Sequence, residues 1–143
     1  MIRFVEEKDV KRLAEISSNN VVPAWNEDDF LGAIVNPQAV VFLQEEDEIN
    51  GYVVCYFAAD EGEIPSIAVE TPCRRSGIGS QLFDALSSYI KDKNVTRLFL
   101  EVREGNSAAV SFYGAKGFCD VGRRKNFYSN PEEDALIMEK KFS

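Results

Sequence analysis

A chain of 143 residues, 45% of them apolar and 28% charged, is long enough for one globular domain with a proper core, and we expect a single domain over residues 1–143. No apolar run approaches the roughly 20 residues of a membrane-spanning helix, and the N-terminus lacks the long apolar core of a signal peptide. These features argue against a membrane partner.

The net charge is −8, with acidic clusters at 45–48, 60–63 and 132–134. Such a surface repels nucleic acid, whereas it would attract a basic peptide or a polyamine. The simpler interpretation is that these clusters are solvated loops that maintain solubility.

Cysteine and histidine usage narrows the chemistry further. Cys55, Cys73 and Cys119 are odd in number and widely spaced, which argues against a disulfide framework or a zinc site and favours the reducing cytoplasm. The chain contains no histidine, so that Ser-His-Asp and Cys-His catalysis and every His-based metal site are excluded. We therefore expect no metal, and a general base that is a carboxylate, Lys, Tyr, Cys or a terminal amine.

Hydrophobic periodicity predicts one strand, two helices and then three more strands in the first half of the chain. In order, these are a strand over 2–5, a helix over 7–17 that ends at Ser17-Ser18-Asn19-Asn20, a helix capped by Asn26 and ended by Asn36-Pro37, and strands over 39–43, 51–58 and 62–69.

The second half predicts a helix from about residue 76 to residue 93, a strand over 96–102, a helix, and two last strands over 118–124 and 135–142. Asn106 is the expected cap of the later helix, and Lys116-Gly117 its expected end. Bulky residues on both faces of 96–102 favour a central strand. Short loops make the strands from 39 to 69 antiparallel, and the helical crossover makes 62–69 parallel to 96–102, so the sequence predicts a mixed sheet flanked by helices.

A glycine-rich turn lies between the strand over 62–69 and the helix that follows it. Gly77 and Gly79 let a ligand approach the backbone, where the first N–H groups of the helix favour an anion such as phosphate. The P-loop and dinucleotide patterns are both absent. The pattern that is present, Arg74-x-x-Gly77-x-Gly79, resembles the acetyl-CoA pyrophosphate loop of the GNAT family of N-acetyltransferases.

A second segment, LFLEVREGNSAAVSFYGAKGF over 98–118, is similar to the LEVRxxNxxAxxxYxxxGF segment of the bacterial ribosomal-protein alanine N-acetyltransferases, a GNAT subgroup. RKNFY over 124–128 and EDALIM over 133–138 resemble the RKNYY and EDAxxM segments of that subgroup, and Trp25 and Phe30 match its WxxxxF. The resemblance covers nearly the whole chain. It implies the GNAT fold, an α/β (α+β) arrangement in which four helices flank a mixed, mostly antiparallel sheet of about seven strands.

The resemblance also implies roles for single residues. It makes Glu101 the general base and Tyr113 the general acid. A carboxylate can help to deprotonate an α-amine with a pKa of roughly 8, directly or through water, and a phenol with a pKa of about 10 can protonate a departing thiolate. Expected substrate contacts are Trp25, Glu101 and Tyr128. Expected contacts to acetyl-CoA, the cosubstrate, are Ile67, Ala68, Val69, Arg74, Arg75, Ser76, Gly77, Ile78, Gly79, Ser80, Asn106 and Tyr113.

Each assignment has a simpler alternative. Glu101 could be a strand-end acid paired with Arg97 or Arg103, and Tyr113 and Trp25 could be core residues. The basic run 123–125 could be a solvated cluster, and we assign it no role. Phe127 stands where the subgroup has a tyrosine, which removes a hydroxyl that could orient a peptide.

The sequence thus predicts a cytoplasmic enzyme that moves acetyl directly to a protein N-terminal α-amine, namely the N-terminal alanine of a small-subunit ribosomal protein. Two alternatives stay open. One is a GNAT enzyme for a small amine such as a polyamine, an antibiotic or an amino-acid derivative. The other is a non-catalytic acyl-CoA-binding module, which would tolerate the loss of Glu101 and Tyr113.

Overall fold

The computed structural model describes residues 1–70, 76–129 and 131–142. The predicted order of helices and strands is confirmed. A short 3-10 turn, η1 (Glu7–Asp9), precedes the first helix. The strands are β1 (Ile2–Phe4), β2 (Ala39–Glu45), β3 (Ile49–Ala58), β4 (Glu61–Val69), β5 (Arg97–Arg103), β6 (Cys119–Tyr128) and β7 (Glu133–Lys141), and the helices are α1 (Val10–Asn20), α2 (Glu27–Val35), α3 (Ile78–Lys91) and α4 (Ser107–Ala115).

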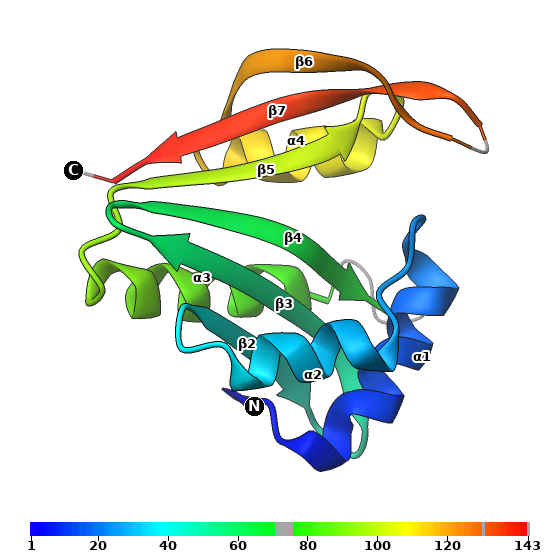
Figure 1. Cartoon of the computed structure of the whole chain (residues 1–143), viewed down its shortest axis with the longest axis vertical. Coiled ribbons are helices and arrows are strands. Elements are labelled where there is room, and N and C mark those ends of the chain that lie inside the picture. Colours follow the sequence, from blue (N-terminus) through cyan, green and yellow to red (C-terminus); the bar gives the residue numbers. More distant parts are fainter. Residues whose placement is uncertain (71–75, 130, 143) are drawn as a thin grey trace.

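The seven strands form one sheet in the order β1-β2-β3-β4-β5-β7-β6 (Figure 1). Every neighbouring pair is antiparallel except β4 and β5, which are parallel because α3 connects them as a crossover. The predicted mixed, mostly antiparallel sheet is therefore confirmed, as is the GNAT fold that it implied.

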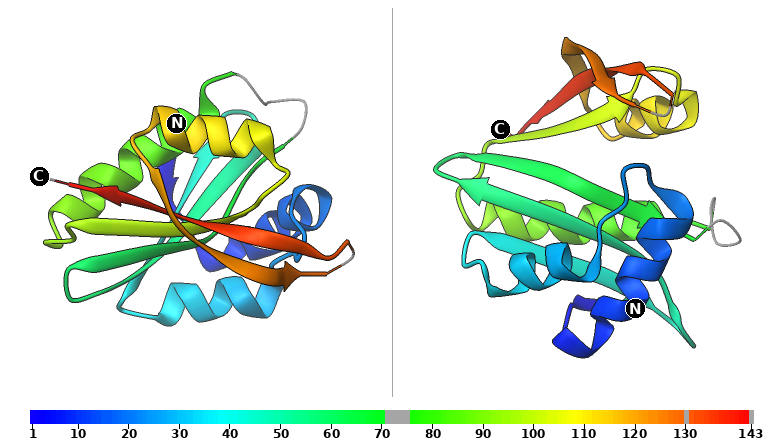
Figure 2. Two further views of the ribbon diagram at one scale, coloured as in Figure 1. Left: turned by 90° about the horizontal axis from the view of Figure 1, so that it is seen from above. Right: turned by 45° about the vertical axis from the view of Figure 1, so that its right-hand side comes forward.

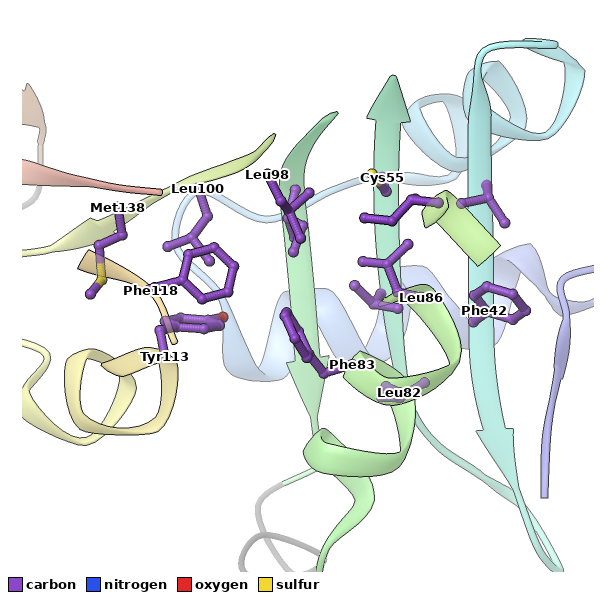
Figure 3. Close-up of a cluster of buried hydrophobic side chains, with 14 of the residues drawn as sticks. Phe42, Cys55, Leu82, Phe83, Leu86, Leu98, Leu100, Tyr113, Phe118 and Met138 are labelled. Atoms are coloured by element: carbon purple, nitrogen blue, oxygen red, sulfur yellow. The ribbon is translucent and has the colours of Figure 1, made fainter. Parts of the chain in front are cut away.

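Helices cover both faces of the sheet (Figure 2). On one face α3 and α4 pack against the strands, and Leu82, Phe83 and Leu86 of α3 form a core with Leu98 of β5 and Phe118 (Figure 3). On the other face α1 and α2 pack against the first strands through a second core that contains Leu13, Ile16, Phe30, Leu43 and Tyr52. Within the described residues, no helix is both long and apolar enough to span a membrane.

The largest error in a predicted boundary is at the end of the sixth strand, whereas the first helix ends at Asn20, within its predicted end over 17–20. The buried Ser17 hydroxyl accepts a hydrogen bond from the Trp25 N–H at 2.8 Å. The last residue of this helix, Asn20, donates to Glu70 at 2.7 Å. The sixth strand runs four residues past Arg124, because a bulge lets its pairing with β7 continue.

The predicted central position of β5 in the sheet is confirmed, but only one of its two faces is fully buried. The strand pairs with β4 and β7 and lies inside the sheet. Its buried residues alternate, however, because only the face toward α3 and α4 is covered: Leu98, Leu100 and Val102 are buried, whereas Phe99 and Glu101 are half-buried. The less covered face carries Glu101, the predicted general base.

The feature that positions the site is the separation of β4 from β5. The two strands pair only from Glu61 opposite Arg97 to Ile64 opposite Leu100, although both run on beyond these positions (Figure 1). An irregularity in the pairing of β3 with β4 adds one residue to β4 in this region, which includes Pro65. Proline has no N–H for a ladder, and an added residue bends a strand. The parallel pair therefore opens beyond Ile64 and Leu100.

Candidate active site

A cavity of about 1540 Å³ lies where β4 and β5 separate. Its walls are residues 64–69 of β4 and residues 100–103 of β5, together with the first turns of α3 and α4. The last residue of α1, the segment 21–25 that follows it and the end of β6 also contribute to the lining. The cavity thus joins segments that lie more than 100 residues apart in the sequence.

The end of the cavity at α3 is suited to an anion. Gly77 caps this helix with φ +87, a left-handed conformation that glycine adopts without strain, and an added Cβ would meet nothing within 4 Å. Gly77, Gly79 and Ser80 line the cavity. The N–H groups of the first helical turn have no partner within the helix, so this turn can bind a phosphate.

The expected cosubstrate contacts fall into three groups. Ile67, Ala68 and Val69 line the cavity along β4, as Asn106 and Tyr113 do from α4 and its cap. Ser76 and the buried Ile78 are not part of the lining, and Ile78 packs in the core, so that only its backbone could serve a ligand. Arg74 and Arg75 lie outside the described residues.

Glu101 lies where two cavities meet. It lines the cavity between β4 and β5 and also a smaller one of about 540 Å³ next to Tyr56 and Phe99. Its side chain is 23% exposed, and its Oε1 lies 2.9 Å from Nε of Arg124. Desolvation raises the pKa of Glu101 above its ordinary value, the positive charge of Arg124 opposes this, and the negative charge of Glu63 adds to it. Such a carboxylate is a stronger base than one in water.

The predicted alternative partners of Glu101 are wrong. Arg97 pairs with Glu61 and Glu139, and Arg103 pairs with Glu133. Both arginines are thus engaged with other carboxylates.

Tyr113 is both a core residue and a cavity residue. Its ring packs edge-on against Phe112 and Phe118, with centroid distances of 5.4 and 5.6 Å, and it lies beside Phe118 in Figure 3. Desolvation raises the pKa of Tyr113 well above its ordinary value, and the nearby Tyr128 adds to the increase. The phenol therefore keeps its proton over the whole neutral range.

The expected substrate contacts Trp25 and Tyr128 both line the cavity, and they come from two different segments. Trp25 also packs against Phe30, with centroids 5.1 Å apart, so its core role and its lining role coexist. Tyr128 holds the guanidinium of Arg103 at 4.4 Å from its ring centroid. Burial raises the pKa of Tyr128, and the negative charge of Glu101 raises it further.

Asn106 has the predicted cap role. Its side-chain oxygen accepts from the Ala109 N–H at 3.1 Å, and the same residue lines the cavity. The cap therefore fixes the first turn of α4 at the edge of the site.

Sequence reasoning missed several residues of the site. Arg124 was assigned no role, although the motif that contains it was recognised, and it contacts Glu101. Glu63 was read as part of a solvated acidic loop, although Pro65 two residues later is a signal for a strand irregularity. Phe127 and Asp29 also line the cavity, and only the folded chain brings them there.

A mixed sheet that opens above a helix N-terminus is the architecture expected of an N-acetyltransferase. The chain belongs to the acetyltransferase (GNAT) family, because the sequence model of that family matches residues 7–118. It is therefore an acetyl-CoA-dependent N-acetyltransferase.

Several relatives of this chain are acetyltransferases named for one acceptor protein. The chain is 33% identical over 145 residues to the [ribosomal protein bS18]-alanine N-acetyltransferase of Haemophilus influenzae (96% of each chain) and 30% identical over 145 residues to that of Haemophilus ducreyi (96% of this chain and 97% of the relative). The crystal structure of the ribosomal-protein-S18-alanine N-acetyltransferase from Escherichia coli superposes with a TM-score of 0.91 at 27% identity, covering 100% of this chain and 94% of that one.

The described residues fit acetyl-CoA, the cosubstrate of the family. An added Cβ at Gly77 would meet open space, which leaves room for phosphate oxygens at the start of α3. Beyond its pairing with β5, β4 offers an edge at which Ile67 and Val69 line the cavity. An extended ligand can therefore run from the helix N-terminus along this strand toward Glu101.

Proposed function

We propose that this enzyme transfers acetyl from acetyl-CoA directly to the N-terminal α-amine of a protein, and that its acceptor is the N-terminal alanine of a small-subunit ribosomal protein of the bS18 kind. The observation that carries the proposal is the position of Glu101, a half-buried carboxylate at the junction of two cavities. The relatives named for bS18 alanine acetylation, which align with 96% of the chain, support this acceptor.

Acetyl-CoA supplies an acyl thioester that is open to attack by a neutral amine. Glu101 takes the proton that the amine loses, directly or through a water molecule, and its raised pKa makes it a better base than an exposed carboxylate. Tyr113 gives its proton to the departing thiolate, and its burial in the cavity wall keeps that proton in place until then. Backbone N–H groups along the open edge of β4 orient the thioester carbonyl.

The transfer is direct, without an acyl-enzyme. Desolvation raises the pKa of the buried Cys55 thiol to about 12, so it is not a nucleophile at neutral pH. Cys119 is exposed on β6 and does not line the cavity. Cys73 lies outside the described residues, and the chain has no histidine to activate it.

The acceptor side of the cavity suits a basic peptide. Asp29, Glu63 and Glu101 contribute carboxylates to the lining, and Trp25 and Tyr128 contribute rings. Carboxylates attract a cationic segment, and the rings provide apolar contact for its first side chains. We infer a cytoplasmic location from this acceptor and from the odd number of cysteines.

The test is acetyl-CoA-dependent mass gain on three acceptors. They are a peptide with a free N-terminal alanine and a basic tail, the same peptide blocked at its N-terminus and carrying lysines, and spermidine. We expect the free-amine peptide alone to gain one acetyl group. Acetylation of only the lysines or of spermidine would contradict the proposed acceptor, and binding of CoA without any transfer would contradict catalysis.

A further inference from the structure

The ion pair between Glu101 and Arg124 joins two strands that are not neighbours. Glu101 lies on β5 and Arg124 on β6, and β7 runs between them. Glu101 pairs with Ile137 of β7, and Gly122 pairs with the same Ile137 from the other side. Because side chains alternate along a strand, Arg124 lies on the same face as Gly122 and Glu101, two strands away and two residues further along, opposite Ala135. Two strand spacings and two residue steps separate the two backbones by about 12 Å. The long guanidinium side chain crosses this distance to reach Oε1 at 2.9 Å.

A bulge in β6 follows Arg124 directly. From Arg124 opposite Ala135 to Tyr128 opposite Glu133, β6 advances four residues while β7 advances two. Asn126 has φ +54 in this bulge, and its N–H donates to Oδ1 of Asp134 at 3.0 Å. A bulge of this kind redirects the side chains of its strand and is held here by a specific hydrogen bond.

The bulge places an aromatic ring against Arg124. The guanidinium carbon lies 5.5 Å from the ring centroid of Phe127, within the range of a cation–π contact. The ring limits the positions that the guanidinium can take. Arg124 therefore contacts both Phe127 and Glu101, although 57% of its side chain is exposed.

Arg124 offsets two effects that disfavour the ionised form of Glu101, namely burial and the charge of Glu63. Glu63 faces Glu101 from β4 and disfavours a second negative charge, and burial disfavours any charge. Tyr128 faces it from β6 as a neutral phenol, and Ile137 of β7 carries no charge. Arg124 is the cation that opposes these effects. It contacts Oε1, and within the described ranges no side chain or N–H donates to Oε2, so the second oxygen can accept a proton.

We propose that Arg124 is a positioning residue for acetyl transfer: through its ion pair it orients the Glu101 carboxylate and maintains its negative charge. This rests on the proposed role of Glu101 as the base. Arg124 itself does not touch the reacting atoms. It serves the reaction by presenting a charged, correctly turned carboxylate to the acceptor amine.

The test compares Arg124→Gln with Lys125→Gln, which removes the same charge from the neighbouring, exposed position. Steady-state rates on the alanine peptide are measured between about pH 5 and pH 9 and divided by the fraction of neutral amine, so that the remaining acid limb belongs to the enzyme. For Arg124→Gln we expect roughly a tenfold lower kcat, a KM for the peptide within about twofold of the original, and an acid limb about one pH unit higher. Lys125→Gln should match the original enzyme, and Arg124→Lys should lie between the two.

Two outcomes overturn the proposal. One is an Arg124→Gln enzyme with unchanged kcat and an unchanged acid limb. The other is a lower KM with unchanged kcat, which would mean that Arg124 competes with the acceptor amine for Glu101. Glu101→Gln is measured beside them as a test of the proposed base. Full activity in Glu101→Gln would contradict the role of Glu101 as the base. A loss of activity in Glu101→Gln without an effect in Arg124→Gln would support Glu101 as the base and contradict only the role of Arg124. Thermal melts of all variants identify any loss through unfolding.

Discussion

Gly79 of α3 and Phe112 of α4 are in close contact at the α3 end of the cavity: a Cβ built on Gly79 would lie 3.3 Å from Cζ of Phe112. Both residues line the cavity, and Phe112 in turn packs against Tyr113. The spacing between the two helices therefore depends on the missing side chain of Gly79.

A larger residue at this position should weaken cosubstrate binding. Gly79→Val would push Phe112 away or fill the cavity next to the first turn of α3, and we expect a Kd for acetyl-CoA about tenfold higher, equivalent to about 1.4 kcal/mol. Titration calorimetry with acetyl-CoA measures this directly. An unchanged Kd in a folded Gly79→Val enzyme would show that the gap between the helices is not part of the binding site.

At Gly32, which does not line the cavity, an added side chain should stabilise the protein. It is an exposed residue inside α2, and an added Cβ would meet nothing within 4 Å. Gly32→Ala should raise the free energy of unfolding by about 0.5–1 kcal/mol, because alanine loses less backbone freedom in a helix. Gly117→Ala is the matched opposite: φ there is +96, so the same change should destabilise by about 1–2 kcal/mol. Urea unfolding measures both, and kcat should stay unchanged in Gly32→Ala.

Removing the hydroxyl of Tyr113 should affect turnover and not acceptor binding. We expect Tyr113→Phe to lower kcat by about 100-fold with little change in KM, because the phenol acts only when the thiolate departs. The ring would keep its contacts with Phe112 and Phe118, so the melting temperature should hardly change. A variant with full turnover would assign Tyr113 to the core alone.

The burial of Tyr113 also predicts the shape of the alkaline limb. Its pKa is raised by desolvation, so the phenol stays protonated above its ordinary value of 10. The enzyme should consequently show no decline from this group as the pH rises to about 10. A rate profile on the alanine peptide, with stability checked at each pH, tests this, and a decline with a midpoint below 10 that disappears in Tyr113→Phe would contradict it.

The sequence predicted those features that depend on local pattern. The face of α3 is an example: Ile78, Leu82, Phe83, Leu86, Tyr89 and Ile90 recur at helical spacing, and all are buried except Tyr89, which is half-buried. The cap at Asn26 and the parallel pair of β4 and β5 followed from similar rules. These elements are correct because tertiary contacts agree with local preference.

What the sequence could not predict depends on register. Glu101 and Arg124 meet only because β7 inserts between β5 and β6 and the pairing places both on one face. The basic run 123–125 reveals neither the strand order nor the face on which Arg124 lies. Such a run is usually a solvated surface cluster, and the sequence alone predicts no more than that. The separation of β4 from β5 likewise depends on an irregular pairing, of which Pro65 was the only local sign.

The last prediction concerns Arg3 and Asp9, an ion pair next to the second core. Asp9 is buried, with 4% of its surface exposed, and its carboxylate accepts two hydrogen bonds from the Arg3 guanidinium, at 2.9 and 3.0 Å. The backbone N–H of Glu6 donates a third at 2.8 Å. The hydrogen bonds from Arg3 are the main reason that the pKa of Asp9 is lower than its ordinary value of 3.8, and they outweigh the desolvation that opposes them.

A carboxylate whose pKa is lower in the folded state stabilises the fold at pH values above its unfolded pKa, and this stability is lost as the pH falls through the folded pKa. Asp9→Asn should therefore cost about 2–3 kcal/mol at pH 7, the value of hydrogen bonds to a charged group, and progressively less below about pH 4. Urea unfolding at several pH values measures the difference, with Glu7→Gln, an exposed acid in the same turn, as the charge-matched control. A constant difference between the original protein and Asp9→Asn from pH 7 to pH 3 would mean that Asp9 stabilises the turn by its shape and not by its charge.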